Sequence, residues 1–149
     1  MSTFILERTI KFADVDPARI VFYPRYFEMI NETVEDWFRL DLDADFRTMA
    51  TNDRGTPLVR IEAQFKKPGY LYDRLQLRLT PAAIGRSSLA LRIEAVRDVT
   101  TIFHAELSIV HVDLGSGKPA SWPDDLRQRI KTRIRAVSEG DVSPRPGTS

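Results

Sequence analysis

The sequence contains no cysteine and only two histidines among its 149 residues. Without cysteine, the chain can form no disulfide or thiolate metal site, and it has no cysteine nucleophile. His104 and His111 alone are too few for a histidine-rich metal centre. We therefore expect a function that needs no metal.

An excess of charge of one sign and a long hydrophobic run are also lacking. The net charge is +1 at pH 7, so no global field directs the protein towards nucleic acid. No apolar run is long enough to span a bilayer, and the first residues do not resemble a secretory signal. We expect a cytoplasmic protein that binds neither nucleic acid nor membrane.

What the sequence does contain is typical of one globular domain with a core of its own, with 42% hydrophobic residues. Residues 24–40 carry a long amphipathic helix pattern, and Pro24 suits the first helical position. Bulky apolar side chains then recur at helical spacing, namely at Phe27, Ile30, Val34, Trp37 and Phe38. We expect this helix to lie at the centre of the fold.

Five segments alternate apolar and polar side chains and are predicted to be strands: residues 4–12, 58–66, 73–80, 87–97 and 101–112. Short connections favour antiparallel pairing, with the last four strands in a meander. A sheet with one apolar face and one bulky helix predicts an α+β fold in which the sheet curls around the helix. One helix covers only part of five strands, so we also expect a dimer.

The C-terminal part of the chain is predicted to contain a second helix, which begins near Ser121 and Asp124. Its apolar stripe is narrow, with Leu126, Ile130 and Ile134, so this helix should lie on the surface. Residues 138–149 are rich in serine, proline and glycine and are predicted to be a flexible tail. The predicted domain is therefore residues 1–137.

An acidic turn, Asp14-Val15-Asp16-Pro17, precedes the long helix. An aspartate before proline is usually a turn residue. Here, however, Asp16 stands near a helix start at Tyr23, where free N–H groups and the helix dipole favour developing negative charge. A carboxylate beside such a site suits acyl transfer. Asp14 and Asp16 alone cannot fill the shell of Mg²⁺ or Ca²⁺, so we interpret Asp14 as part of a capped, solvated turn.

The segment of residues 14–26 reads Asp-Val-Asp-Pro-Ala-Arg-Ile-Val-Phe-Tyr-Pro-Arg-Tyr. It resembles the hotdog-fold acyl-CoA thioesterases, most closely the 4-hydroxybenzoyl-CoA thioesterase branch, whose segment usually reads Asp-x-Asp-Pro-Ala-Gly-Ile-Val-x-Tyr-Pro-x-Tyr. Residues 65–73 and 85–89 match two weaker signals of that family. The resemblance covers residues 4–135 and implies a hotdog fold, in which a curved antiparallel sheet wraps one long central helix.

The resemblance further implies hydrolysis of an acyl-CoA thioester with an aryl or a short to medium acyl group. Asp16 would act on the thioester carbonyl as nucleophile or general base, and the backbone N–H of Tyr23 would polarise that carbonyl. CoA is then part of the substrate, and no cofactor is needed. The family's sites lie at dimer interfaces, which implies a homodimer or a tetramer built from two dimers.

The remaining contacts with substrate or CoA are expected from Arg19, Pro24, Tyr26, Lys66, Arg86 and Ser87. The cations among them suit the phosphates of CoA. Arg19 stands where the family usually has glycine. If that glycine has a positive φ, the loop must differ here.

Two rival functions remain to be weighed. Hydratases and dehydratases on the same fold use a histidine near the helix start, and this chain has none before His104. The other rival is a non-catalytic module that binds acyl-CoA or an acyl carrier. Arg19 keeps that alternative open, because a salt bridge from it would hold Asp16 out of action.

Overall fold

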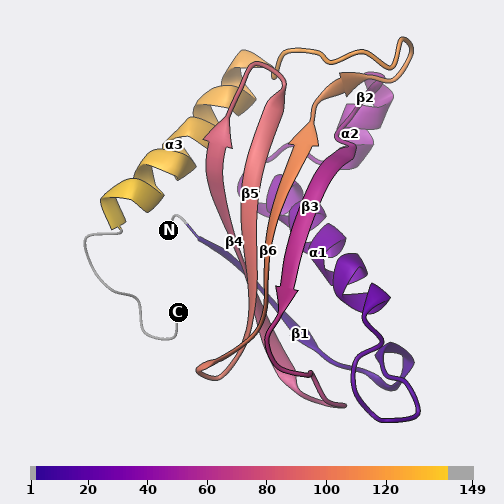
Figure 1. The fold of residues 1–149 in the computed structure, drawn as a ribbon. Coiled ribbons are helices and arrows are strands. Elements are labelled where there is room, and N and C mark those ends of the chain that lie inside the picture. The colour runs from indigo at the N-terminus through magenta and orange to yellow at the C-terminus, as the bar shows by residue number, and fades with distance from the viewer. Residues whose placement is uncertain (1–2, 141–149) are drawn as a thin grey trace.

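The structure is a computed structural model that describes residues 3–140, with side chains through residue 137. Its elements follow one another along the chain, as Figure 1 shows. They are β1 (Phe4–Thr9), a 3₁₀ turn (Phe12–Asp14), α1 (Pro24–Asp36), a π-helical turn (Trp37–Asp41), α2 (Phe46–Thr51), β2 (Arg54–Gly55), β3 (Leu58–Phe65), β4 (Arg74–Ile84), β5 (Ser88–Arg97), β6 (Thr100–Val110), β7 (Val112–Asp113) and α3 (Asp124–Gly140).

The main sheet has five antiparallel strands in the order β1-β4-β5-β6-β3. Only β4, β5 and β6 form a meander, so the prediction that β3 continues it was wrong. The connection of residues 66–73 carries the chain from one edge of the sheet across to β4. It is long enough to make hydrogen bonds of its own, including one of 2.9 Å from the Val21 N–H to the Gly69 carbonyl.

The core lies between α1 and the apolar face of this sheet, as predicted. Met29, Trp37 and Phe38 are fully buried on the helix side, and Leu77 and Ile93 are fully buried on the sheet side. The same alternation buries further positions of the meander, namely Leu75, Leu79, Leu89, Leu91, Ala95, Phe103, Ala105, Leu107 and Ile109. Val96 and Ile102 are also buried, out of this alternation, where the pairing of β5 with β6 shifts. Together with α1, these strands form the predicted hotdog arrangement of a sheet around a central helix.

Three local predictions about the strands were wrong. The pairing of β3 with β6 shifts between Leu58 and Arg60, so Val59 is a bulge residue and Leu58 takes the apolar position. Phe12 lies beyond the end of β1 in the 3₁₀ turn and is 78% exposed. β4 continues through Pro81 to Ile84 and does not stop at residue 80, because Pro81 lies past the last residue paired with β1, where no ladder N–H is needed.

The C-terminal helix α3 packs against β4 beside the far end of α1 (Figure 1). Leu126 and Ile130 are buried in the main core, so the narrow stripe completes the core on one side while the rest of the helix faces outward. Just before the helix, Trp122 stacks on the ring of Phe38. The helix continues to Gly140, into the segment predicted as a tail, and residues 141–149 of that tail lie outside the described residues.

β3 occupies an edge of the sheet, and its apolar side chains remain partly uncovered. Leu58 is 50% exposed and Phe65 is 47% exposed. An exposed strand edge with apolar side chains is a surface that natural proteins usually cover. Within residues 3–140, no helix has the length and hydropathy that a membrane crossing requires.

Candidate active site

The acidic turn forms a tight hairpin between β1 and α1. The Asp16 N–H donates to the Ile20 carbonyl at 3.0 Å, and the Arg19 N–H donates to the Asp16 carbonyl at 2.8 Å. The Asp16 carboxylate accepts a further hydrogen bond from the Ala18 N–H at 2.8 Å. This is an Asx turn, which fixes the carboxylate relative to its own backbone. The side chain is half-buried, with part of it open to an incoming group.

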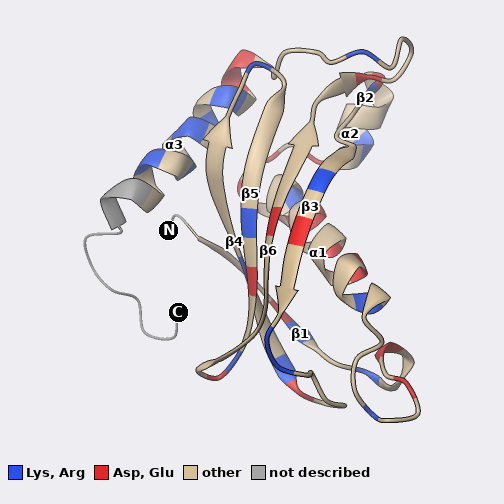
Figure 2. Cartoon of the chain, in the orientation of Figure 1, with Lys and Arg blue, Asp and Glu red and all other residues tan. Residues whose placement is uncertain are grey.

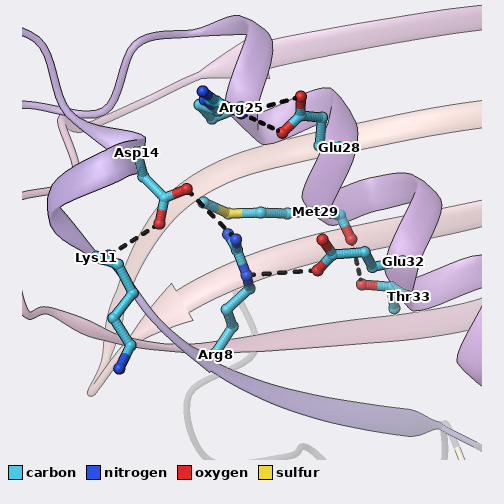
Figure 3. A network of polar contacts seen from close by, with 8 residues as sticks. All are labelled: Arg8, Lys11, Asp14, Arg25, Glu28, Met29, Glu32 and Thr33. Atoms are coloured by element: carbon cyan, nitrogen blue, oxygen red, sulfur yellow. Dashed lines mark hydrogen bonds and ion pairs between the residues drawn. The ribbon is translucent and has the colours of Figure 1, made fainter.

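A buried ion pair fixes the base of this hairpin (Figure 3). Asp14 is only 4% exposed, accepts a hydrogen bond from the Lys11 N–H at 2.8 Å and lies 3.3 Å from the Arg8 guanidinium. Arg8 also reaches Glu32 on α1 at 3.4 Å. The prediction that Asp14 belongs to a solvated turn was therefore wrong. Arg8, the one charged residue on the apolar side of β1, ties the strand, the hairpin and the helix together.

The start of α1 lies directly after this hairpin. The Phe22 N–H donates to the Asp14 carbonyl at 2.9 Å, which holds the two ends of the hairpin together. Pro24 occupies the first helical position and has no N–H, while the Arg25 N–H bonds back to the Phe22 carbonyl at 2.8 Å. The Tyr23 N–H has no acceptor among the described residues. It is therefore a free donor at the positive end of the helix dipole.

The connection of residues 66–73 packs against this helix start. The Gly69 N–H donates to the Tyr26 hydroxyl oxygen at 3.0 Å. The ring of Tyr26 stacks on Phe65 with centroids 5.5 Å apart and packs on Phe103 at 5.1 Å. Burial raises the pKa of the Tyr26 phenol, although the Gly69 hydrogen bond acts in the opposite direction. The connection, the helix start and the edge of the sheet thus form one packed unit.

A hollow of about 330 Å³ opens at this unit. Its lining includes Tyr23, Tyr26 and Lys66, three of the residues predicted from the sequence, together with Ile20, Val21, Phe65, Lys67 and Pro68. Asp16 is not part of the lining, but Ile20 and Val21, which follow it in the same hairpin, are. The sequence reasoning missed Arg8 and Gly69 as supports, and the signal for Arg8 was its place among apolar neighbours.

Arg86 and Ser87 lie elsewhere in the chain. They belong to the turn between β4 and β5, at the opposite end of the sheet from the hairpin (Figure 1). The Arg86 carbonyl accepts from the Trp122 N–H at 3.0 Å, and the Ser87 carbonyl accepts from the His111 N–H at 2.7 Å. A single chain therefore does not bring these two residues together with Asp16.

Arg19 adopts a left-handed backbone conformation with φ of 67°. The hairpin therefore has a positive φ at this position despite the side chain, at a cost of about 1–2 kcal/mol. Arg19 forms no ion pair with the described carboxylates, so the salt bridge that would hold Asp16 out of action does not form. No group of three or more potential metal ligands occurs among the described residues.

Comparison with known proteins places this architecture in a family. The model of the thioesterase-like superfamily matches residues 10–130. A 1,4-dihydroxy-2-naphthoyl-CoA hydrolase from Synechocystis sp. is 27% identical over 87% of this chain and 96% of its own length.

Solved structures agree with this placement. A thioesterase superfamily protein from Jannaschia sp. matches with a TM-score of 0.82 and 26% identity, over 89% of this chain and 94% of that one. A 1,4-dihydroxy-2-naphthoyl-CoA thioesterase from Synechocystis matches with a TM-score of 0.78 and 24% identity, over 91% of this chain and 98% of that one. The chain belongs to the thioesterase-like superfamily and has its hotdog fold.

Proposed function

We propose that this protein hydrolyses an acyl-CoA thioester to the free acid and CoA. The observation that carries the proposal is the free Tyr23 N–H at the start of α1, directly after the hairpin that presents Asp16. A donor at a helix N-terminus stabilises the oxyanion that forms when a thioester carbonyl is attacked. Membership of the thioesterase-like superfamily supports the same reaction.

In the proposed mechanism, the thioester oxygen accepts the Tyr23 N–H and the Asp16 carboxylate acts on the carbonyl carbon. Direct attack by Asp16 forms a mixed anhydride and expels the CoA thiolate, and water then hydrolyses the anhydride. Alternatively, Asp16 takes a proton from a water molecule that attacks the carbonyl. A thiolate leaves readily, so neither route needs a strong general acid.

The proposed acyl group is aryl, or short to medium in length. Aromatic walls support an aryl group, because Tyr23, Tyr26 and Phe65 all line the hollow beside the helix start. The two Synechocystis proteins reported above are named for a 1,4-dihydroxy-2-naphthoyl-CoA substrate, which is also an aryl thioester. Pro24, which adjoins this lining, would help to shape the pocket.

The proposed assembly is a homodimer, or a tetramer of two dimers, in which a partner chain completes each site. Pairing of β3 with its own copy would cover Leu58 and Phe65 at the exposed edge. Antiparallel pairing would also place the partner's β4–β5 turn towards the hairpin end of this chain, where Arg86 and Ser87 could meet CoA. Sedimentation equilibrium should give at least twice the chain mass of 17.1 kDa, and a monomer at micromolar concentration would contradict the assembly.

The test of the proposed function is release of free thiol from a panel of acyl-CoA esters by wild type and by Asp16→Asn. Asparagine can accept the same hydrogen bond from the Ala18 N–H, so the substitution removes the charge and keeps the turn. Asp45→Asn is a matched control, because Asp45 caps α2 through the Thr48 N–H at 2.7 Å, remote from the hairpin. Tight binding of the esters without turnover would favour the non-catalytic module instead.

A further inference from the structure

Two bulky residues near the hairpin occupy backbone conformations that favour glycine. Arg19 has φ of 67° and Tyr72 has φ of 66°. The other described non-glycine residues with positive φ are Asp43, Asp53 and Asp98. Aspartate visits this region readily because its short side chain bonds to the local backbone, whereas arginine and tyrosine gain no such relief. Strain of this kind at two neighbouring positions is an observation from which function can be inferred.

The two strained residues lie on adjacent segments. The Leu71 N–H donates to the Arg19 carbonyl at 3.4 Å, so the segment that holds Tyr72 contacts the hairpin directly. The Tyr72 N–H is bonded to the Ile10 carbonyl at 2.8 Å, which fixes its backbone from the other side. The Tyr72 side chain is nevertheless 67% exposed, and that of Arg19 is also exposed. Both side chains therefore project outward from a rigid backbone.

The same surface carries positive charge that the protein does not neutralise. Lys66 and Lys67 line the hollow beside Tyr23, and Ile20, the neighbour of Arg19, lines it as well. Arg19, Lys66 and Lys67 form no ion pair with the carboxylates of residues 3–137. By contrast, Arg25 is paired with Glu28 at 2.9 Å and Arg97 with Asp73 at 2.6 Å. Unpaired cations on the same two segments as an exposed aromatic ring suit an anionic ligand with a planar group.

We propose that Arg19 and Tyr72 form a clamp for the nucleotide end of CoA, outside the reaction centre. The Arg19 guanidinium pairs with the phosphates, since a planar guanidinium matches phosphate geometry. The Tyr72 ring stacks on adenine. Because hydrogen bonds already fix the backbone of both residues, binding needs to order only their side chains. This inference rests on the proposed function and adds the residues that would recognise CoA.

The clamp is tested without turnover by calorimetric titration with adenosine 3′,5′-bisphosphate, the nucleotide part of CoA. Arg19→Gly and Tyr72→Gly should each weaken binding about tenfold, because each removes one contact. Asp43→Gly is the matched control, since it replaces another residue with positive φ in the segment after α1, remote from the hairpin. It should bind the probe as wild type does. Equal binding by all four proteins would overturn the clamp.

A kinetic comparison separates the two ends of the substrate. Benzoyl-CoA carries the nucleotide, and benzoyl-N-acetylcysteamine presents the same thioester without it. Arg19→Gly and Tyr72→Gly should lower kcat/KM for benzoyl-CoA about tenfold more than for the truncated thioester, mainly through KM. Equal losses on the two substrates would contradict a role in nucleotide recognition.

Thermal stability provides a further readout. Glycine relieves the left-handed strain, so both variants should melt about 1–3 °C higher than wild type while they bind the probe less tightly. If wild type turns over no acyl-CoA but binds the probe, and the two variants bind it less tightly, the proposed function fails and the clamp stands. If wild type turns over acyl-CoA and the variants match it in binding and kinetics, the clamp fails and the function stands.

Discussion

Gly69 is a position at which three buried side chains leave no room for a Cβ. A Cβ at this position would lie 2.8 Å from both Ile10 Cδ1 and Tyr26 Oη, and 3.2 Å from Val21 Cγ2. Gly69 also makes two hydrogen bonds, from its N–H to Tyr26 and from the Val21 N–H to its carbonyl. The methyl group of Gly69→Ala would therefore clash with Ile10 after β1, Val21 in the hairpin and Tyr26 in α1.

The expected loss of stability follows from these contacts. Overpacking by one carbon in a closed site costs about 1–3 kcal/mol. Displacement of the Tyr26 hydroxyl from the Gly69 N–H adds about 1 kcal/mol. The total of about 2–4 kcal/mol corresponds to a melting temperature lower by roughly 4–16 °C for a domain of this size. Movement of the helix start should also lower kcat/KM for acyl-CoA, by about 10–100-fold.

Urea unfolding followed by tryptophan fluorescence measures the first effect, and thiol release measures the second. Gly115→Ala is the control, because its Cβ would meet only Asp113 Oδ1 at 3.4 Å in an exposed turn. If Gly69→Ala were as stable as the control to within 0.5 kcal/mol, the packing of residues 66–73 against the helix start would be refuted.

Two further substitutions test the supports of the site. Tyr26→Phe should cost about 1–3 kcal/mol at neutral pH, because the Gly69 N–H loses its acceptor. Since burial raises the pKa of the Tyr26 phenol, its contribution is present below about pH 10 and lost as pH rises through the folded-state pKa, so the phenylalanine variant should lose less stability in alkali than wild type. Arg8→Met should cost about 2–3 kcal/mol, because it leaves the Asp14 carboxylate buried without a cation. The double variant Arg8→Met with Asp14→Asn should be no less stable than Arg8→Met alone, and additive losses would contradict the coupling.

Much of the fold could be predicted from periodicity, and the limits of that prediction are physical. Alternation of apolar and polar residues determines which face of a strand is buried, so most core positions of β4, β5 and β6 were predicted. Val96 and Ile102 were missed, because the pairing of β5 with β6 shifts between Ala95 and Val96. It does not determine which strand lies beside which, so β3 was placed next to β4 when it pairs with β6. A bulge shifts the alternation by one residue, which is why Val59 was assigned the place of Leu58.

The candidate site was predicted only in part. The sequence analysis predicted that Tyr23, Tyr26 and Lys66 serve the site, and the structure gathers them around one hollow. Burial of Asp14 depends on Arg8, six residues earlier, and on the way β1 passes under α1 (Figure 3). Arg86 and Ser87 were grouped with the site by charge and turn type, but these do not reveal the end of the sheet on which a turn lies.

The distribution of charge also follows from the fold. Charged residues recur along α3 and at intervals in the strands of the main sheet (Figure 2). Arg92 and Glu106, for example, pair across neighbouring strands at 3.6 Å. Strand-face pairs of this kind contribute little to stability when exposed. Arg19, in the hairpin, takes part in no such pair, and its place beside the candidate site is why we assign it to a ligand.

The most direct test of this account is the rate of thiol release from benzoyl-CoA by the Asp16→Asn variant, measured together with its melting temperature. We predict a loss of kcat of at least about 100-fold, with a melting temperature unchanged because the Asx turn is retained, while Asp45→Asn keeps full activity. Turnover by Asp16→Asn at the wild-type rate would show that another group performs the chemistry.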